Sequence, residues 1–104
     1  MFISGGENIY PEEIENTLKT HKLIEKVIVL KKKSFEFGYR PVAVIKMNFF
    51  VSFNVDRFLY GKLSKIKIPV KYFYWPKKYN KRLKDSRVVM QRLFSQNKLK
   101  ILKI

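Results

Sequence analysis

The chain has 104 residues, 46% hydrophobic and 15% aromatic, which can bury one core but leaves little room for large substrate pockets beside it. It contains no cysteine, no signal peptide and no apolar run long enough to span a membrane, so we expect a soluble protein of the reducing cytoplasm. The net charge of +15 arises within residues 37–104, where 17 Lys or Arg face only Asp56 and Asp85. These residues should attract anions.

The first predicted helix spans residues 11–21. Pro11 suits a first helical position, acidic residues fill the first turn and lysines lie near the end, as the helix dipole favours. Tyr10, Ile14 and Leu18 recur at intervals of four and therefore share a face. We expect this face to point into the core.

Two paired strands are predicted next, over residues 27–30 and 41–47, because both runs are rich in β-branched residues. The segment between them, residues 34–40, is too polar and too interrupted by Gly38 to continue either strand. Its aromatic residues indicate that it packs as an ordered loop. The apolar run 48–53 then reads as a strand extension or as a patch that meets another domain.

Asn54 is a suitable cap for a second helix over residues 55–64, on which Phe58, Leu59 and Leu63 share a face. A third strand is predicted over residues 70–75, which are rich in aromatic strand formers.

A cationic loop over residues 76–85 follows, and Ser86 can cap a last helix. Its buried stripe should consist of Val89, Met90, Leu93 and Phe94. The order of elements predicts a single α+β domain over residues 1–104, with a small, mostly antiparallel three-stranded sheet and flanking helices.

The chain begins with a turn that lacks Cβ atoms at two positions, Ser4-Gly5-Gly6, ahead of the helix that Pro11 starts. Such a turn lets backbone amides approach a ligand closely, but it serves equally well to begin a helix. The whole string of residues 4–15 resembles the glycine-loop motif that opens the C-terminal domain of adenylate-forming acyl-CoA synthetases.

Three further segments resemble the same domain and follow in the same order. Residues 36–44 look like the family's acidic, aromatic and glycine segment before a central strand, and residues 63–70 look like its helix end and proline. Residues 84–87, Lys-Asp-Ser-Arg, are similar to its terminal Lys-x-x-Arg. Within the family, the first and last of these segments look most like the ligases of menaquinone biosynthesis.

The resemblance implies a reaction in two steps. ATP and a carboxylate give an acyl-adenylate and pyrophosphate, and the CoA thiol then displaces AMP. It also implies that this domain is a lid that swings against a large N-terminal adenylation domain. The phosphate loop, the adenine site, the acyl pocket and the Mg²⁺ that accompanies ATP would belong to that large domain, so the chain alone should be inactive.

The resemblance further assigns site residues. Lys84 is the candidate catalytic residue, because a lysine ammonium can neutralise charge on the α-phosphate and orient the carboxylate. Ser4, Gly5 and Gly6 are the candidate cofactor-binding residues, which would line the pantetheine tunnel. Arg40, Lys62 and Lys65 are additional candidates for contacts to CoA phosphates.

The sequence departs from the family pattern around Lys84. Leu83 stands where many members have glycine, and Asp85 stands where an apolar residue is usual, so an adjacent carboxylate would partly neutralise the lysine. Lys81 is the fallback candidate, and Lys84 is preferred because only it has Arg87 three positions later.

Two alternatives stay open. The charge, with the aromatic run 72–75 among lysines, would suit a nucleic-acid-binding module. Consecutive aromatics must alternate between core and surface, so we do not expect nucleic acid as the partner. The chain could also be a non-catalytic remnant of a truncated ligase gene, or a piece cut at a domain boundary. We expect no metal site, because the glutamates at the helix start have no second cluster of ligands, and we expect His21 to be a polar helix-end residue.

Overall fold

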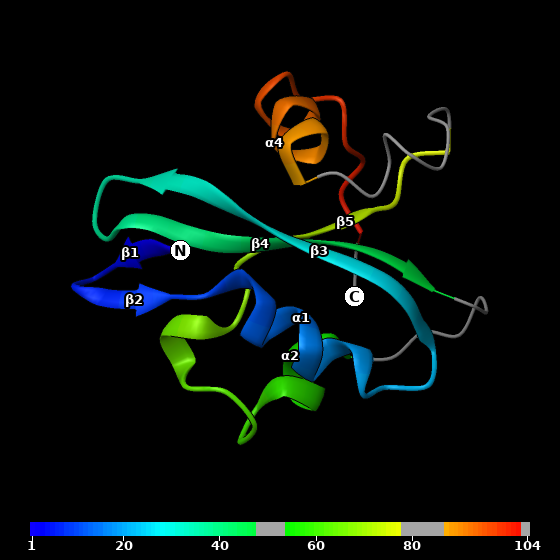
Figure 1. Ribbon diagram of the computed structural model, residues 1–104, viewed down its shortest axis with the longest axis horizontal. Helices are drawn as coiled ribbons and strands as arrows, with labels where there is room; N and C mark the ends of the chain where they lie inside the picture. Colours follow the sequence, from blue (N-terminus) through cyan, green and yellow to red (C-terminus); the bar gives the residue numbers. More distant parts are fainter. Residues whose placement is uncertain (48–53, 78–86, 103–104) are drawn as a thin grey trace.

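A computed structural model describes residues 1–47, 54–77 and 87–102. Figure 1 shows a central sheet with helix α4 on one side and helices α1 and α2 on the other. A small two-stranded ribbon lies at one end of this sheet. The elements run in the order β1 (Phe2–Ser4), β2 (Glu7–Ile9), α1 (Pro11–Lys19), β3 (Ile24–Ser34), β4 (Gly38–Met47), α2 (Val55–Leu59), the 3₁₀ helix η1 (Lys65–Lys67), β5 (Tyr72–Tyr74) and α4 (Arg87–Ser95).

The predicted α+β domain with a three-stranded sheet is confirmed, in the order β3-β4-β5. Strands β3 and β4 form a long antiparallel hairpin, whereas β5 pairs parallel to β4. The parallel pairing arises because the chain returns to the sheet through α2 and η1 on one face, rather than through a tight turn.

Strands β3 and β4 are buried on both faces, which explains the uninterrupted apolar runs in the sequence. Their alternate side chains point to two separate clusters. One cluster lies between the sheet and α1 and α2, and includes Val29, Ala43 and Ile45. The other lies between the sheet and α4, and includes Leu30 and Val44.

The interpretation of residues 34–40 as a loop was wrong. Strand β3 continues to Ser34 and β4 begins at Gly38, so only three residues form the turn. The polar side chains do not end the strands, because the backbone ladder continues beyond the apolar core as far as the Ser34 and Gly38 pair. Phe35 at the tip is fully exposed rather than packed.

Helix α1 begins at Pro11 as predicted and ends at Lys19, two residues earlier than expected. Ile14 and Leu18 are fully buried, as predicted. The prediction that Tyr10 shares this buried face was wrong, since Tyr10 is 51% exposed. Tyr10 is the N-cap residue, has an extended backbone and therefore lies outside the helix.

Helix α2 has the predicted cap, since the Asn54 Oδ1 accepts a hydrogen bond of 3.0 Å from the Arg57 backbone N–H. The helix ends at Leu59 instead of residue 64. Gly61 has a φ of 86°, a left-handed conformation that an α-helix cannot contain.

Helix α4 buries Met90 and Leu93 fully and Val89 and Phe94 partly, which confirms the predicted stripe. Its expected cap, Ser86, and the apolar run 48–53 lie outside the described residues. In the part of the chain that the structure describes, no helix is long and apolar enough to cross a membrane.

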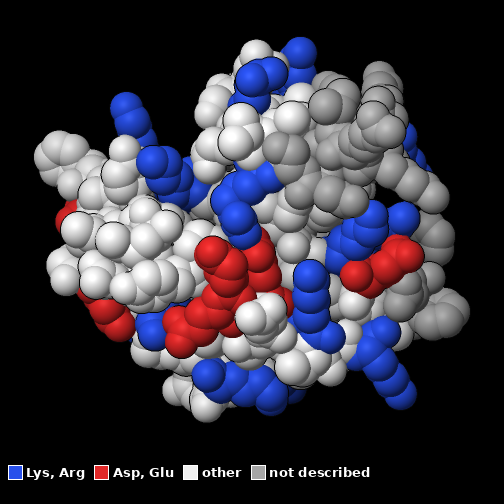
Figure 2. All heavy atoms as spheres, viewed as in Figure 1, with Lys and Arg blue, Asp and Glu red and all other residues white. Residues whose placement is uncertain are grey.

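The charges are unevenly placed on this fold. Figure 2 shows acidic side chains gathered where α1 lies in Figure 1, with lysines and arginines around them. Described residues 57–77 and 87–102 contain ten Lys or Arg and no Asp or Glu. The acid-free half therefore comprises η1, β5 and α4.

Candidate functional site

The glycine turn is a β-hairpin turn rather than a direct helix start. Ser4 pairs with Glu7 across it, and Gly5 and Gly6 have φ values of 56° and 83°. Two consecutive left-handed residues are what a two-residue type I′ hairpin requires, and glycine adopts them without a steric penalty. The three residues of β2 then separate the turn from Tyr10 and α1.

Gly5 is held tightly against the tip of the β3–β4 hairpin. Its backbone N–H donates a hydrogen bond of 2.9 Å to the Phe37 carbonyl. A Cβ at Gly5 would lie 3.1 Å from the Phe37 ring, whereas a Cβ at Gly6 would have no atom within 4 Å. Gly5 therefore fixes the turn, and Gly6 leaves open space in front of it.

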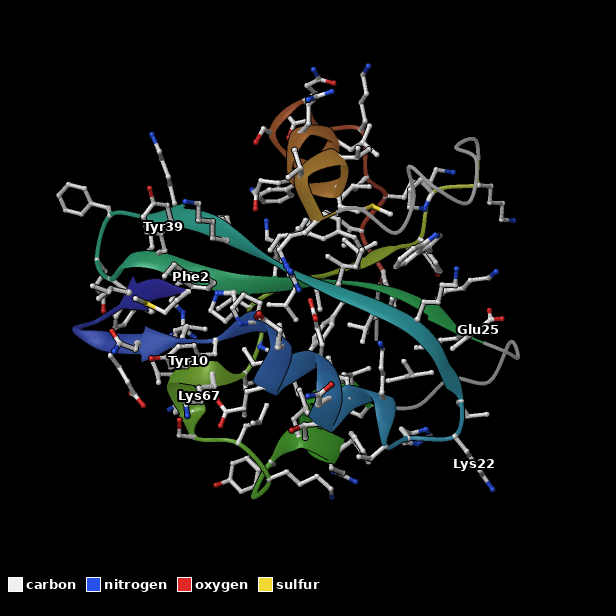
Figure 3. The ribbon with its side chains drawn as sticks, in the orientation of Figure 1. Phe2, Tyr10, Lys22, Glu25, Tyr39 and Lys67 are labelled. Carbon is white, nitrogen blue, oxygen red and sulfur yellow. The ribbon has the colours of Figure 1, made fainter. Side chains whose placement is uncertain are left out.

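Ser4 contributes differently from the two glycines. The residue is completely buried, and its Oγ has no hydrogen-bond partner in the structure. Phe2, two residues earlier in β1, is also buried and contacts Tyr39 edge to face, with ring centres 6.2 Å apart (Figure 3). A ligand at this turn would meet Gly5 and Gly6, while the Ser4 hydroxyl faces the core.

One cationic side chain, Arg40, contacts residues that lie beside the glycine turn, and Lys67 is paired with α1. The Arg40 guanidinium donates a 3.2 Å hydrogen bond to the Ile66 carbonyl and lies 5.1 Å from the Phe37 ring centre. Burial lowers the pKa of Arg40 from its ordinary value, and an arginine still stays protonated at neutral pH. Lys67, labelled in Figure 3, pairs with Glu13 at 3.0 Å.

The other two cations proposed from sequence differ in their surroundings. Lys62 lies 4.6 Å from the Phe58 ring centre, and Lys65 is an exposed residue of η1. Arg40 lies near the glycine turn, because Phe37 and Ile66, which it contacts, both approach Gly5. Lys65 directly precedes Ile66 in η1.

The candidate catalytic residue Lys84 and its fallback Lys81 lie outside the described residues, as does Asp85. Arg87, the last residue of the Lys-x-x-Arg segment, is the first residue of α4. Its Nη2 donates to the Oε2 of Glu15 on α1, so the end of this segment is attached to the helix that follows the glycine turn.

Glu15 was interpreted from the sequence only as part of an acidic helix start. In the structure it is the one buried carboxylate among the described residues. Its Oε2 also accepts a 2.8 Å hydrogen bond from the Val29 backbone N–H, while the Arg87 Nε lies 3.4 Å from the Val29 carbonyl. Glu15 and Arg87 together occupy both backbone groups of Val29 on the outer edge of β3.

Gln91 repeats this arrangement one helical turn later. Its side-chain oxygen accepts from the Lys31 backbone N–H at 3.2 Å, and its side-chain nitrogen donates to the Lys31 carbonyl at 3.0 Å. Side chains therefore take the place of a fourth strand along the β3 edge and fix the position of α4 there. The sequence held a signal for this: Glu15 stands four residues after Pro11 and three before Leu18, which places it at the border of the helix face that was expected to point into the core.

The glycine turn and the beginning of α4 lie apart in the fold. Figure 1 shows the Gly5-Gly6 turn at the end of the β1–β2 ribbon, away from α4 on the other side of the sheet. The fold therefore presents two separate surfaces, one at the glycine turn and one where α4 begins.

The aromatic run considered for nucleic-acid stacking is largely inside the fold. Tyr72, Phe73 and Trp75 are each less than 10% exposed, and only Tyr74 has about half of its surface accessible. The Tyr72 hydroxyl donates to Asp56 at 2.6 Å. One accessible aromatic ring does not make the row of stacked rings that single-stranded nucleic acid needs.

His21 lies two residues after the end of α1 and makes local contacts. Its Nδ1 accepts a 3.1 Å hydrogen bond from the Leu23 N–H, and its ring contacts Phe58 edge to face at 4.8 Å. Within residues 1–47, 54–77 and 87–102, no three His, Asp or Glu side chains are grouped to hold a metal ion.

We then compared the chain with known proteins. No family model matches the sequence. Over 91 residues the chain is 46% identical to 2-succinylbenzoate–CoA ligase of Haemophilus influenzae, a match that covers 84% of this chain and 20% of that protein. The chain is homologous to the C-terminal region of such ligases.

Solved structures of these ligases agree. Wild-type E. coli MenE with a bound m-phenylether-linked analogue of OSB-AMS gives a TM-score of 0.81 at 29% identity, covering 91% of this chain and 20% of that chain. A double mutant of Bacillus subtilis o-succinylbenzoate CoA synthetase bound with its product analogue OSB-NCoA gives 0.79 at 28% identity, covering 98% and 21%. The chain thus spans about a fifth of the length of the ligases that it matches, and the family resemblance and the fold expected from it are confirmed.

Proposed function

We propose that residues 1–104 form the C-terminal lid domain of an ATP-dependent acid–CoA ligase, specifically the 2-succinylbenzoate–CoA ligase of menaquinone biosynthesis. The observation that carries the proposal is the 46% identity to such a ligase over most of this chain. The domain would act in the cytoplasm with a large N-terminal adenylation domain, and alone it would be inactive.

In the first step, ATP and the carboxylate form an acyl-adenylate and release pyrophosphate. Lys84 would supply a positive charge to the α-phosphate and the carboxylate, because a compact ammonium stabilises charge that develops in the transition state. The Glu15 and Arg87 pair supports this role, since it fixes the beginning of α4 three residues after Lys84.

In the second step, the CoA thiol attacks the acyl-adenylate and AMP leaves. The glycine turn would line the path of the pantetheine chain. The open space in front of Gly6 and the exposed backbone of the turn support this, because a ligand can approach the main chain closely there. The structure favours Gly5 and Gly6 over Ser4 for direct contact, since the Ser4 side chain is buried.

ATP and CoA are therefore the proposed substrates of the complete enzyme. Mg²⁺ would enter with ATP through the large domain. The acid-free half of the fold suits the polyphosphates of both substrates.

The test is to join or mix this chain with the large domain of the Haemophilus influenzae relative and to follow pyrophosphate release and thioester formation separately. We expect activity only in the presence of both parts. Lys84→Ala should slow pyrophosphate release by about 10²–10³-fold, with thioester formation from added acyl-adenylate retained.

Lys81→Ala is the matched control and should leave both steps nearly unchanged. Equal losses in the two variants would remove the assignment of Lys84. A well-folded mixture without thioester formation would support the remnant alternative instead.

A nucleic-acid-binding module is the second candidate, and the net charge of +15 is the observation in its favour. Titration with a labelled oligonucleotide at rising salt distinguishes the two. Tight binding with a steep salt dependence would support this alternative, whereas negligible binding at physiological salt would remove it.

A further inference from the structure

A groove of about 340 Å³ lies on the side of the sheet that carries α4, away from the glycine turn and Arg87. In Figure 1 the chain leaves α4 and descends beside β5, with which it forms a β-bridge. Its lining residues come from β3, from β5 and the residue before it, from α4, and from the segment after α4: Lys32, Lys71, Phe73, Phe94, Asn97, Leu99 and Ile101.

The walls of the groove are apolar and include two aromatic rings. Phe73 and Phe94 contact each other edge to face, with ring centres 5.4 Å apart. Leu99 is half-buried, and Ile101 is 55% exposed despite its apolar side chain. The groove therefore leaves apolar surface in contact with water, which a ligand of similar character would cover.

The groove is built on a fixed backbone. Ile101 pairs with Phe73 in an antiparallel bridge. The Tyr74 N–H donates to the Lys100 carbonyl at 2.9 Å, and the Leu102 N–H donates to the Tyr72 carbonyl at 2.8 Å. The segment after α4 is thus hydrogen-bonded to β5, so a ligand would not have to order it.

Two lysines supply an uncompensated charge at this groove. The Nζ of the half-buried Lys32 donates a hydrogen bond to the Lys33 carbonyl at 3.4 Å, and Lys71 is exposed. Neither makes an ion pair with a carboxylate of the described residues, and no lining residue is acidic. Apolar walls with a cationic rim suit a ligand that is apolar at one end and anionic at the other.

We propose that this groove binds an aryl carboxylate, with the ring against Phe73 and Phe94 and the carboxylate between Lys32 and Lys71. The ring is favoured over an alkyl chain because aromatic side chains gain from edge-to-face contacts with another ring. The volume is near the lower end for small-molecule sites, which limits the ligand to about one or two rings. The site does not depend on the proposed function, because it uses neither Lys84 nor the glycine turn.

Titration of the isotope-labelled chain with sodium 1-naphthoate, followed by amide chemical shifts at constant ionic strength, tests the proposal. We expect saturable shifts centred on residues 71–73 and 94–101, with a dissociation constant on the order of 0.1–1 mM for a ligand of this size. The neutral 1-naphthamide should bind more weakly by about threefold or more. Octanoate distinguishes an alkyl from an aryl carboxylate and should also bind more weakly.

Variants then locate the site. Lys32→Gln and Lys71→Gln should each weaken naphthoate binding by about three- to tenfold. Ile101→Ser should weaken naphthoate and naphthamide alike, because it removes apolar surface and no charge. Lys98→Gln is the matched control, since it makes the same charge change at an exposed residue that lies between Asn97 and Leu99 but does not itself line the groove, and should change binding by less than about twofold.

Three results would overturn the proposal: shifts spread over all the cationic surfaces, equal binding of naphthoate and naphthamide, or equal losses in the Lys71 and Lys98 variants. Each variant's amide spectrum reports whether it is folded. If Lys32→Gln does not fold, the exposed Lys71 still decides the outcome.

Discussion

The glycine turn and the beginning of α4 are held in place by opposite means. The turn is fixed by its backbone, through the bond from Gly5 to the Phe37 carbonyl, and needs side chains to be absent. The beginning of α4 is fixed by side chains, Glu15, Arg87 and Gln91, which bind the backbone of the β3 edge. The first region is therefore sensitive to an added atom at Gly5, and the second to the loss of a charge or an amide.

The α4 end should show the larger effect of a single substitution. Glu15→Ala leaves both the Val29 N–H and the Arg87 guanidinium without their partner. We expect a loss of about 2–3 kcal/mol in the free energy of unfolding, less than for a fully buried ion pair because Arg87 is partly exposed. Urea denaturation measures it.

Glu12→Ala is the control, because Glu12 is an exposed residue of the same helix turn. It should change stability by less than about 0.5 kcal/mol. If the two variants were equally stable, the attachment of α4 through Glu15 would be energetically unimportant.

The glycine turn should show a difference between its two glycines. Gly5→Ala combines a left-handed backbone with a contact of 3.1 Å to Phe37, whereas Gly6→Ala has the backbone strain alone. We expect about 2 kcal/mol for Gly5→Ala and about 1 kcal/mol for Gly6→Ala in thermal or urea unfolding. The reverse order would mean that the Phe37 ring moves aside at little cost.

Tyr72 adds a pH-dependent test of stability, because it lies in the core cluster between the sheet and helices α1 and α2. Burial raises the pKa of Tyr72 well above its ordinary value near 10, with the hydrogen bond to Asp56 as the second cause. The folded state thus keeps the phenol proton when the unfolded state has lost it. Stability from this group is fully present below about pH 10 and is lost as the pH rises further.

We expect the wild-type chain to lose about 1.4 kcal/mol per pH unit above pH 10 relative to Tyr72→Phe, which has no ionisable phenol. Unfolding is followed by far-UV circular dichroism at each pH. Parallel pH profiles of the two proteins would contradict the assignment of this effect to Tyr72.

The smallest effect is expected at Gln91. Gln91→Ala removes two hydrogen bonds to Lys31 at an exposed strand edge, where water can replace them. A loss of about 1 kcal/mol in urea unfolding is expected. Gln96→Ala, at an exposed position just after α4, should have almost no effect.

The elements with a strong local pattern were predictable from the sequence. The Asn54 cap, the start of α1 at Pro11 and the buried stripe of α4 follow from short-range rules that the tertiary structure did not alter. The boundary of α2 was wrong although Gly61 stood within the predicted range, because the helical spacing of Leu63 outweighed the glycine.

What could not be predicted depends on partners distant in sequence. Glu15 and Arg87 are 72 residues apart, and no periodicity links them. The glycine turn was found through resemblance, but its hairpin was not predicted, although two glycines between short alternating segments are a recognised hairpin signal. The parallel pairing of β5 depends on the path through α2 and η1, which local patterns do not specify.

The side chains along the β3 edge have a consequence for solubility. A strand with unoccupied backbone groups is a template on which another chain can add a strand, and the Val27-Ile28-Val29-Leu30 run has the composition of β-aggregating segments. Glu15, Arg87 and Gln91 occupy the Val29 and Lys31 groups that such a strand would use. Removing α4 would therefore expose this edge for pairing with another chain, and a fragment that ends before Arg87 should form fibrils more readily than the whole chain.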